Sequence, residues 1–299
     1  MGTTERASNP STSSPGAMAA PYVLLRDRTG RGEFTEAADG EPIWFERFGD
    51  GEPVWVLIHG GMCDASFWSE QIAAFASNGT VIVLDLPGHG QSGKHRQLWS
   101  ISAFGDDVSR VVHACGAEEV IVVGHSMGGV VALESARLLG PAAKGVIVVD
   151  FLHDICSKAP QHKPNVPPEQ HGQQIPEAAR QQMALALRRG MFTANAGGLQ
   201  ETIVQSLLSF SPEIGAALRQ AVSAYSIPDG IQGISSIPLS IVQSSLRSTD
   251  VESIRQLHPN ARIIRFTDAG HFVMLEKPVP FNNVLENEHL IMRRITEPL

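Results

Sequence analysis

The amino-acid sequence predicts a mostly parallel β-sheet covered by helices on both faces, an α/β fold. Three observations lead to this prediction. Short runs of β-branched residues alternate with longer, helix-like segments along the chain. The runs are apolar throughout, as expected for strands whose two faces are both covered. At 299 residues, the chain is long enough for one large domain that carries an insertion.

The first half of the chain supplies most of the expected sheet. Its strands are short runs rich in Val and Ile, and its helices are longer segments with apolar residues at helical spacing. Gly140-Pro141 is expected to end the last of these helices. In chain order we expect strands over residues 43–48, 54–59, 81–85, 120–123 and 146–149, and helices over residues 65–77, 101–115 and 128–139.

From residue 152 to residue 235 the strand-like runs disappear. A Pro-, Gln- and His-rich stretch at 159–176 is followed by helical patterns at 177–189, 199–210 and 213–225. Strands return at 239–243 and 261–266, and a last helix is expected after Pro278 and Pro280. We therefore predict a flexible tail over 1–20, a core of 21–151 and 236–299, and an inserted helical cap over 152–235.

Composition limits the possible partners. The chain has 23 basic and 31 acidic residues, a formal charge of −8, which disfavours nucleic acid or an anionic membrane surface. No apolar run is long enough to span a bilayer, and the N-terminus lacks the features of a signal peptide. Three cysteines, Cys63, Cys115 and Cys156, form no Cys-x-x-Cys pair and cannot all be paired, so we expect no disulfide framework. This indicates a reducing compartment, by default the cytoplasm.

The most informative motif is Gly124-His125-Ser126-Met127-Gly128, which joins an apolar run to a helix-like segment. Small residues two before and two after a serine allow a tight strand-to-helix turn that pushes the hydroxyl out of the sheet. We interpret Ser126 as a nucleophile. Its hydroxyl needs a base, a carboxylate to orient that base, and hydrogen-bond donors for the developing oxyanion.

His271 is the candidate base, because it follows the last expected strand in a loop with a glycine directly before it. His125 lies beside Ser126 in the chain, but adjacent residues on a turn point apart, so we expect His125 to pack against or bond to the scaffold. The candidate oxyanion donors are the backbone amides of Met127 and of Gly61. We expect the residues from Asp85 to Ser92, including His89, to shape a loop and not to take part directly in catalysis.

Taken together, the motifs resemble the α/β-hydrolase fold superfamily, in the capped branch that contains serine esterases, haloalkane dehalogenases, epoxide hydrolases and C–C bond hydrolases. The resemblance spans about residues 40–295 and is specific for the fold but not for the substrate. It rests on five signals in order: His59-Gly60-Gly61, Asp85-x-Pro87-Gly88-x-Gly90-x-Ser92, Gly124-x-Ser126-x-Gly128, the helical insertion after Asp150, and Gly270-His271 through Glu276-Lys277-Pro278.

The resemblance leaves two candidates for the carboxylate that orients the base. In many such folds the acid follows the strand before the last one, but here the first carboxylate after residue 243 is Asp250, several residues late. A second location, used by some haloalkane dehalogenases and lipases, is the end of the strand after the nucleophile helix, where Asp150 stands. We favour Asp150 and keep Asp250 as the alternative, although Asp250 also suits the N-cap of a helix.

A serine nucleophile implies acyl transfer, whereas the dehalogenases and epoxide hydrolases of this fold use an aspartate. We therefore expect hydrolysis of carboxylic esters or lactones. Thioesterase or C–C bond hydrolase activity with the same residues, a non-hydrolytic ligand-binding role, and cofactor-free perhydrolysis are the alternatives.

The sequence contains no phosphate-binding loop, dinucleotide fingerprint or spaced metal-ligand set, so we predict no cofactor and no metal. The expected partner is a small ester-type molecule, and the oligomeric state stays open. We expect Cys63, close to the oxyanion loop, to be a buried, inert thiol. Apolar residues of the insertion could line an acyl site: Met183, Leu187, Met191, Phe192, Leu207, Leu208 and Phe210.

Overall fold

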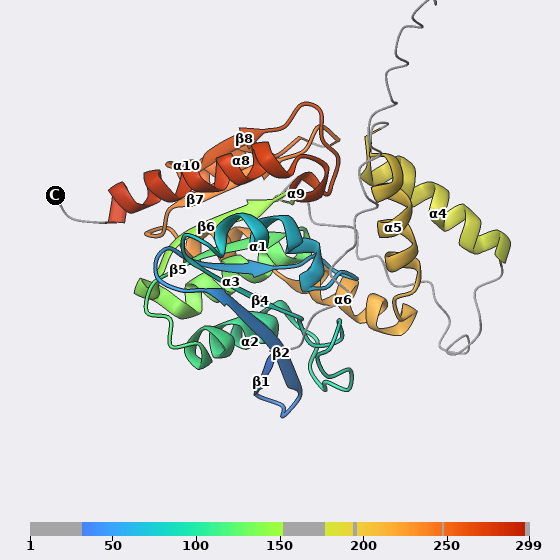
Figure 1. Ribbon diagram of the computed structural model, residues 1–299, viewed down its shortest axis with the longest axis horizontal. Coiled ribbons are helices and arrows are strands. Elements are labelled where there is room, and N and C mark those ends of the chain that lie inside the picture. Colours follow the sequence, from blue (N-terminus) through green and yellow to red (C-terminus); the bar gives the residue numbers. More distant parts are fainter. Residues whose placement is uncertain (1–31, 152–176, 194–195, 247, 297–299) are drawn as a thin grey trace, which may run out of the picture.

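One mixed sheet of eight strands forms the centre of the molecule (Figure 1). The computed structural model describes residues 32–151, 177–193, 196–246 and 248–296. The strands lie in the order β1-β2-β4-β3-β5-β6-β7-β8; β2 is antiparallel to both of its neighbours, and the rest pair in parallel. The strands are β1 (Glu33–Glu36), β2 (Pro42–Gly49), β3 (Val54–Ile58), β4 (Thr80–Leu84), β5 (Val120–His125), β6 (Ala143–Val149), β7 (Leu239–Gln243) and β8 (Arg262–Arg265).

Helices cover both faces of this sheet. Apolar residues of α1, α9 and α10 pack on one face, and those of α2, α3, α7 and α8 pack on the other. The helices are η1 (Ala65–Trp68), α1 (Ser69–Phe75), α2 (Ile101–Ala114), α3 (Met127–Leu139), η2 (Gly140–Ala142), α4 (Glu177–Met191), α5 (Gly197–Leu208), α6 (Pro212–Ala224), α7 (Ile227–Gly233), α8 (Val251–Leu257), α9 (Val273–Glu276) and α10 (Pro278–Thr296).

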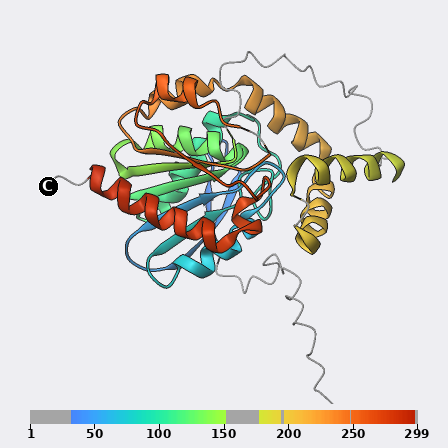
Figure 2. The ribbon, with the colours of Figure 1, turned by 90° about the horizontal axis from the view of Figure 1, so that it is seen from above.

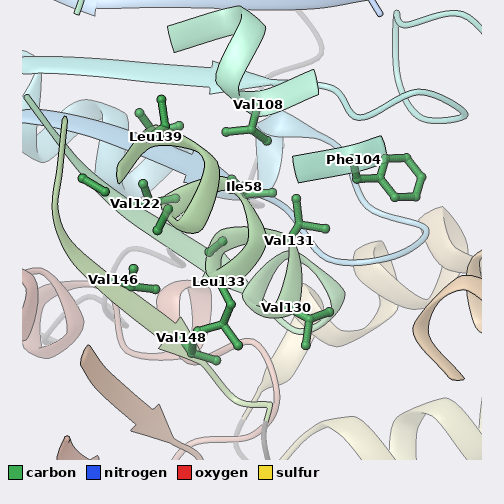
Figure 3. Close-up of a cluster of buried hydrophobic side chains, with 14 of the residues drawn as sticks. Ile58, Phe104, Val108, Val122, Val130, Val131, Leu133, Leu139, Val146 and Val148 are labelled. Carbon is green, nitrogen blue, oxygen red and sulfur yellow. The ribbon is translucent and has the colours of Figure 1, made fainter. Parts of the chain in front are cut away.

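The core between the sheet and helices α2 and α3 is made mostly of aliphatic side chains, with Phe104 among them (Figure 3). Val122 and Val148 on the strands are fully buried, and so are Val130, Val131 and Leu133 on α3. Every residue of β3 and of β4 is buried as well. Their β-branched side chains suit a strand that is covered on both faces, and burying each one stabilises the fold by about 1.5–3 kcal/mol.

The helices α4 to α7 enter the chain between β6 and β7, and we call them the inserted helices (residues 177–233). Figures 1 and 2 show α4 and α5, in yellow, standing beyond one end of the sheet. The last residues of α4 contact the loop after β8, because the amide of His271 donates to the carbonyl of Met191 at 2.7 Å. Parallel strands present their carboxyl ends at one edge, so the loops after β3, β5, β6 and β8 meet there.

The predicted mostly parallel sheet with helices on both faces is confirmed, and four details of the prediction were wrong or incomplete. The segment expected as one helix over 65–77 is split into η1 and α1, because the Asp64 side chain accepts from the amide of Ser66 at 2.8 Å and caps a 3-10 turn. Strand β1 was missed because its residues are mostly exposed and polar. Helices α7 and α9 were missed because each is short.

The tail predicted over 1–20, the Pro-, Gln- and His-rich stretch at 159–176 and Cys156 lie outside the described residues. Among those described, no helix is both long and apolar enough to cross a bilayer.

Candidate active site

Ser126 stands at a sharp turn between β5 and α3, with a backbone φ of 52° and ψ of −124°. A non-glycine residue with positive φ is uncommon, and here the surrounding contacts impose it. The amide of Ser126 donates to the carbonyl of Val149 at 2.8 Å. A Cβ on Gly124 would lie 2.0 Å from the carbonyl oxygen of Gly128, and a Cβ on Gly128 would lie 2.5 Å from that of Ile58. Both glycines are therefore needed for this turn.

His271 and Asp150 meet at the same edge of the sheet. His271 Nδ1 lies 2.6 Å from Asp150 Oδ2, and Asp150 Oδ1 accepts from the amide of Ser244 at 2.8 Å. The Asp150 side chain is 2% exposed and the His271 side chain 17%. Burial alone would raise the pKa of Asp150, but the hydrogen bonds from His271 and Ser244 outweigh it and lower this pKa. An ionised carboxylate can only accept, so His271 Nδ1 carries the proton of this hydrogen bond, which leaves Nε2 as the ring nitrogen that faces away from the carboxylate.

Asp250, the alternative acid, is engaged elsewhere. Its side chain accepts from the amide of Ser253 at 3.1 Å and is the N-cap of α8. The structure thus brings Asp150, and not Asp250, to His271. Asp150 has a φ of 50°, and its amide donates to the carbonyl of Val242 at 2.7 Å. The chain therefore turns at the end of β6, and the Asp150 carboxylate points toward the loop after β8 that carries His271.

The backbone of His271 is held on both sides. Its amide donates to Met191 of α4, as described above, and its carbonyl accepts from His125 Nε2 at 2.9 Å. The two imidazole rings are 4.6 Å apart between centroids. Burial, with His271 as a like neighbour, lowers the pKa of His125 to about 3, so His125 is a neutral donor. Its side chain bonds to the scaffold, as the sequence predicted.

Gly60 and Gly61 lie directly beside the turn that carries Ser126. A Cβ on Gly60 would be 3.2 Å from Ser126 Cβ, and a Cβ on Gly61 would be 3.5 Å from Met127 Sδ. The two predicted oxyanion donors, Gly61 and Met127, are therefore neighbours across the site. Met127 is the first residue of α3, where a helix leaves its amides without an intrahelical partner.

Two buried histidines fix the shape of this glycine loop. His59 Nε2 accepts from the amide of Leu86 at 3.0 Å, so its Nδ1 donates to the carbonyl of Gly60 at 2.8 Å. His89 Nε2 accepts from the amide of Met62 at 3.1 Å, and burial lowers the pKa of His89 well below its usual value. These contacts are to backbone groups, in agreement with the expectation that His89 shapes a loop.

Asp85 links the same two loops through backbone amides. Its Oδ1 accepts from the amide of Ala65 and its Oδ2 from that of Gln91, each at 2.8 Å. A Cβ on Gly90 would lie 2.0 Å from Asp85 Oδ2, so only glycine fits beside the carboxylate. Asp85 is therefore a structural acceptor that holds the loop after β3 against the loop after β4.

The surroundings of the glycine loop, which contains Gly60 and Gly61, and of the neighbouring loop after β4 are apolar. Leu218 of α6 would be 4.0 Å from a Cβ on Gly61, Ile214 of α6 would be 2.9 Å from a Cβ on Gly88, and the Phe210 ring is 4.9 Å from the His89 ring. Ile214 and Leu218 were missed as lining candidates, although their four-residue spacing on a predicted helix was a signal for them.

Of the predicted lining residues, Phe210 lies against His89 in the loop after β4, and Met183 is 45% exposed. Phe192 and Leu207 are buried in the cluster that includes Phe272. Cys63 is buried, and its Sγ lies 3.6 Å from the carbonyl of Gly61. Burial raises the pKa of this thiol well above its usual value, so a thiolate is disfavoured.

Ser126 Oγ and His271 Nε2 form no hydrogen bond within the described residues. Contacts between a nucleophile and its base are often long before substrate binds and tighten in the substrate complex. Within the same ranges, no group of three or more His, Cys, Asp or Glu side chains is placed to hold a metal ion. A separate pocket of about 370 Å³ lies at the opposite ends of β3 and β5, where Val54, Val120, Lys144 and His289 are among its lining residues.

Comparisons with known proteins define the class. A profile of the alpha/beta hydrolase family matches residues 55–284, so the chain belongs to this family. It is 40% identical over 108 residues to the (E)-2-((N-methylformamido)methylene)succinate hydrolase of Acinetobacter baylyi, a match that covers 36% of each chain. The matches to the first curated relatives cover 24% to 36% of the length of those relatives.

Solved structures agree on the fold. The enol-lactonase of Burkholderia xenovorans has a TM-score of 0.71 at 21% identity, with 85% of this chain and 98% of that chain covered. Est816, described as an N-acyl homoserine lactone degrading enzyme, has a TM-score of 0.66 at 26% identity, with 85% and 99% covered. Together with the family, these relatives support a hydrolase.

Proposed function

We propose that this protein is a serine hydrolase that cleaves carboxylic esters or lactones through an acyl-enzyme, with Ser126 as nucleophile, His271 as base and Asp150 as the acid. The observation that carries the proposal is the 2.6 Å contact between His271 Nδ1 and the buried Asp150 carboxylate, at the edge where Ser126 sits on its strained turn. This contact leaves the lone pair of His271 Nε2 available for a proton.

In the proposed reaction, Ser126 Oγ attacks the acyl carbon while His271 Nε2 takes the hydroxyl proton. The amides of Met127 and Gly61 donate to the oxyanion of the tetrahedral intermediate. His271 then protonates the leaving alcohol oxygen, and the acyl group stays on Ser126. Water, deprotonated by His271, attacks this ester, and the acid product leaves as Ser126 regains its proton. Asp150 holds the imidazole and stabilises its charged form throughout.

The residues around the glycine loop favour an uncharged substrate portion. Leu218 lies beside the proposed donor Gly61, and Ile214 and Phe210 lie against Gly88 and His89 in the neighbouring loop after β4. A charged group placed there would lose its hydration without an opposite charge among these contacts. We therefore infer that the acyl or alcohol group next to Gly61 is apolar. The names of the enol-lactonase and of Est816 are in keeping with an ester or lactone substrate.

We further propose that residues 152–235 act as a cap over a core formed by 21–151 and 236–299. The contacts of α6 with the glycine loops and of α4 with His271 support this division. The free thiols of Cys63 and Cys115 are in keeping with a reducing compartment, and we propose the cytoplasm as the location.

The test is a panel of p-nitrophenyl esters, lactones and thioesters, assayed with the wild type and with Ser126→Ala. We expect turnover of at least one apolar ester or lactone, and loss of that turnover in the variant. Preferential cleavage of thioesters would move the assignment to a thioesterase. If the wild type hydrolyses no member of the panel, or if Ser126→Ala retains full activity, the proposed function is wrong.

A further inference from the structure

The end of α4 runs alongside the loop that carries His271. Besides the bond from His271 to Met191, the rings of Phe192 and Phe272 are stacked with centroids 5.4 Å apart. A Cβ on Gly270 would lie 2.6 Å from the carbonyl oxygen of Met191 and 2.8 Å from Phe192 Cα. The two segments are therefore in direct backbone contact, and a glycine before His271 permits it.

Glu276 joins these segments with a single carboxylate oxygen. Its Oε2 accepts from the amide of Gly270 at 3.0 Å and from Thr193 Oγ1 at 3.1 Å. The other oxygen, Oε1, is buried and has no hydrogen-bond partner within the described residues. The Gly270 amide and the Thr193 hydroxyl are thus the two donors that hold this side chain in place. Glu276 therefore ties the residue before His271 to the residue that follows Met191 and Phe192.

His271 is consequently held by two parts of the molecule. Asp150 and His125, which contact its ring nitrogen and its carbonyl, belong to strand ends of the sheet. Met191, which contacts its amide, belongs to the inserted helices, and Thr193 fixes that end of α4 through Glu276. A displacement of α4 would remove the partner of the His271 amide and pull on Gly270. The position of the imidazole thus depends on the position of the inserted helices.

We propose that Glu276 is a positioning residue that couples the inserted helices to the base, through Thr193 on one side and Gly270 on the other. This inference rests on the proposed function, since it takes His271 as the base. Neither Glu276 nor Thr193 touches the reacting atoms. Their loss should therefore lower kcat, which depends on where His271 stands, more than it changes KM.

The test uses Thr193→Val, which keeps the shape of the side chain and removes only the hydroxyl, and Thr193→Ser, which keeps the hydroxyl. Thr202→Val is the matched control, because the exposed Thr202 hydroxyl bonds only within its own helix, to the carbonyl of Gly198. For each variant kcat and KM on the best ester, the melting temperature and the amide hydrogen exchange of Gly270 and His271 are measured.

We expect Thr193→Val to lower kcat about 3- to 10-fold, the size expected for one hydrogen bond, with KM changed by less than about twofold. Thr193→Ser should restore kcat, Thr202→Val should match the wild type, and exchange at Gly270 and His271 should be faster in Thr193→Val alone. Should Thr193→Val not fold, Glu276→Gln, which keeps an acceptor, and Glu276→Leu, which does not, replace the pair and should differ in the same way.

The coupling is refuted if kcat of Thr193→Val stays within about twofold of Thr202→Val, if the loss appears only in KM, or if Thr193→Ser does not restore kcat. Failure of the proposed function gives a different result, namely a wild type without Ser126-dependent turnover. In that case the exchange data still decide whether the link exists, because equal exchange at Gly270 and His271 in all variants would rule it out.

Discussion

At the scale of single residues, each polar group of His271 that could set its orientation has a defined partner. Asp150 binds Nδ1, Met191 accepts from the amide, and His125 donates to the carbonyl. These three bonds leave Nε2 as the ring atom that, in the proposed function, exchanges a proton with Ser126. This arrangement is what a general base needs, since both its tautomer and its position are fixed before substrate arrives.

The assignment of the acid is testable at this scale. Asp150→Asn keeps the size of the side chain but replaces the ionised acceptor, so the imidazole is no longer held in the productive tautomer. We predict that kcat falls about a thousand- to ten-thousandfold. In Asp250→Asn the new side chain can still cap α8, so kcat should stay within about twofold of the wild type. Steady-state kinetics on one ester compare the two, and the reverse order of losses would reassign the acid.

The sequence allowed Ser126, Gly61, Met127 and His271 to be proposed because their signals are local. Each signal can be recognised within a few residues: a serine that follows an apolar run and has a glycine two residues before and after it, and a histidine that follows the last expected strand. The acid was left open because the choice between two aspartates depends on which strand ends are neighbours in the sheet. β6 lies directly beside β7, and that pairing places Asp150 next to Ser244 and His271.

The contacts of Glu276 were out of reach of sequence reasoning for a similar reason. Its partner Thr193 lies in the inserted helices, and no local pattern links two such distant positions. The bounds of the main elements could be predicted from the sequence, because it shows directly where apolar runs begin and end and where a glycine ends a helix. β7, for example, has the predicted bounds, Leu239–Gln243. Strand β1 is mostly exposed and polar, and α9 is a single turn, so neither is long or apolar enough to show a periodic pattern.

At the scale of elements, the loop between β4 and α2 is fixed by a buried ion pair. Arg96 contacts Asp107 of α2 through two nitrogens, at 2.7 and 3.2 Å, and both side chains are 1% exposed. The Arg96 guanidinium also lies 5.0 Å from the centre of the Phe104 ring. This pair holds the segment that leads to Trp99, whose ring would touch a Cβ on Gly88 at 2.7 Å.

Removing one partner of this pair should be costly. We predict that Asp107→Asn lowers the free energy of unfolding by about 1.5–3 kcal/mol, because Arg96 loses two charged hydrogen bonds and keeps only the longer contact of its Nε with Asp39 Oδ2 at 3.5 Å. The control is Asp106→Asn on the same helix, since Asp106 pairs with Arg110 at the surface and such pairs contribute less than about 1 kcal/mol. Urea unfolding of both variants makes the comparison; equal losses would show that the burial of Arg96 is not what matters.

At the scale of the whole molecule, buried neutral histidines make stability depend on pH. Burial lowers the pKa of His89 and of His125 far below the value of about 6.5 that a histidine has in an unfolded chain. As the pH falls below that value, the unfolded chain takes up protons that the folded protein does not. The folded state therefore loses stability with falling pH, by about 1.4 kcal/mol per pH unit for each such histidine.

We predict that the free energy of unfolding decreases steadily between pH 6.5 and pH 5, the window set by the unfolded value of about 6.5. His89→Gln, which can still accept from the amide of Met62, should reduce this slope by about 1.4 kcal/mol per pH unit. Urea unfolding at a series of pH values measures it. An unchanged slope in His89→Gln would mean that His89 takes up its proton equally in both states.

The proposed function depends on one covalent event, the transfer of an acyl group to Ser126. The most direct measurement is to mix the protein with a p-nitrophenyl ester, quench it with acid within the first turnovers, and locate the added mass by peptide mapping. We predict one acyl group on the peptide that contains Ser126, and none in Ser126→Ala. Hydrolysis that proceeds with no adduct at Ser126, or with the adduct on another residue, would contradict the proposed function.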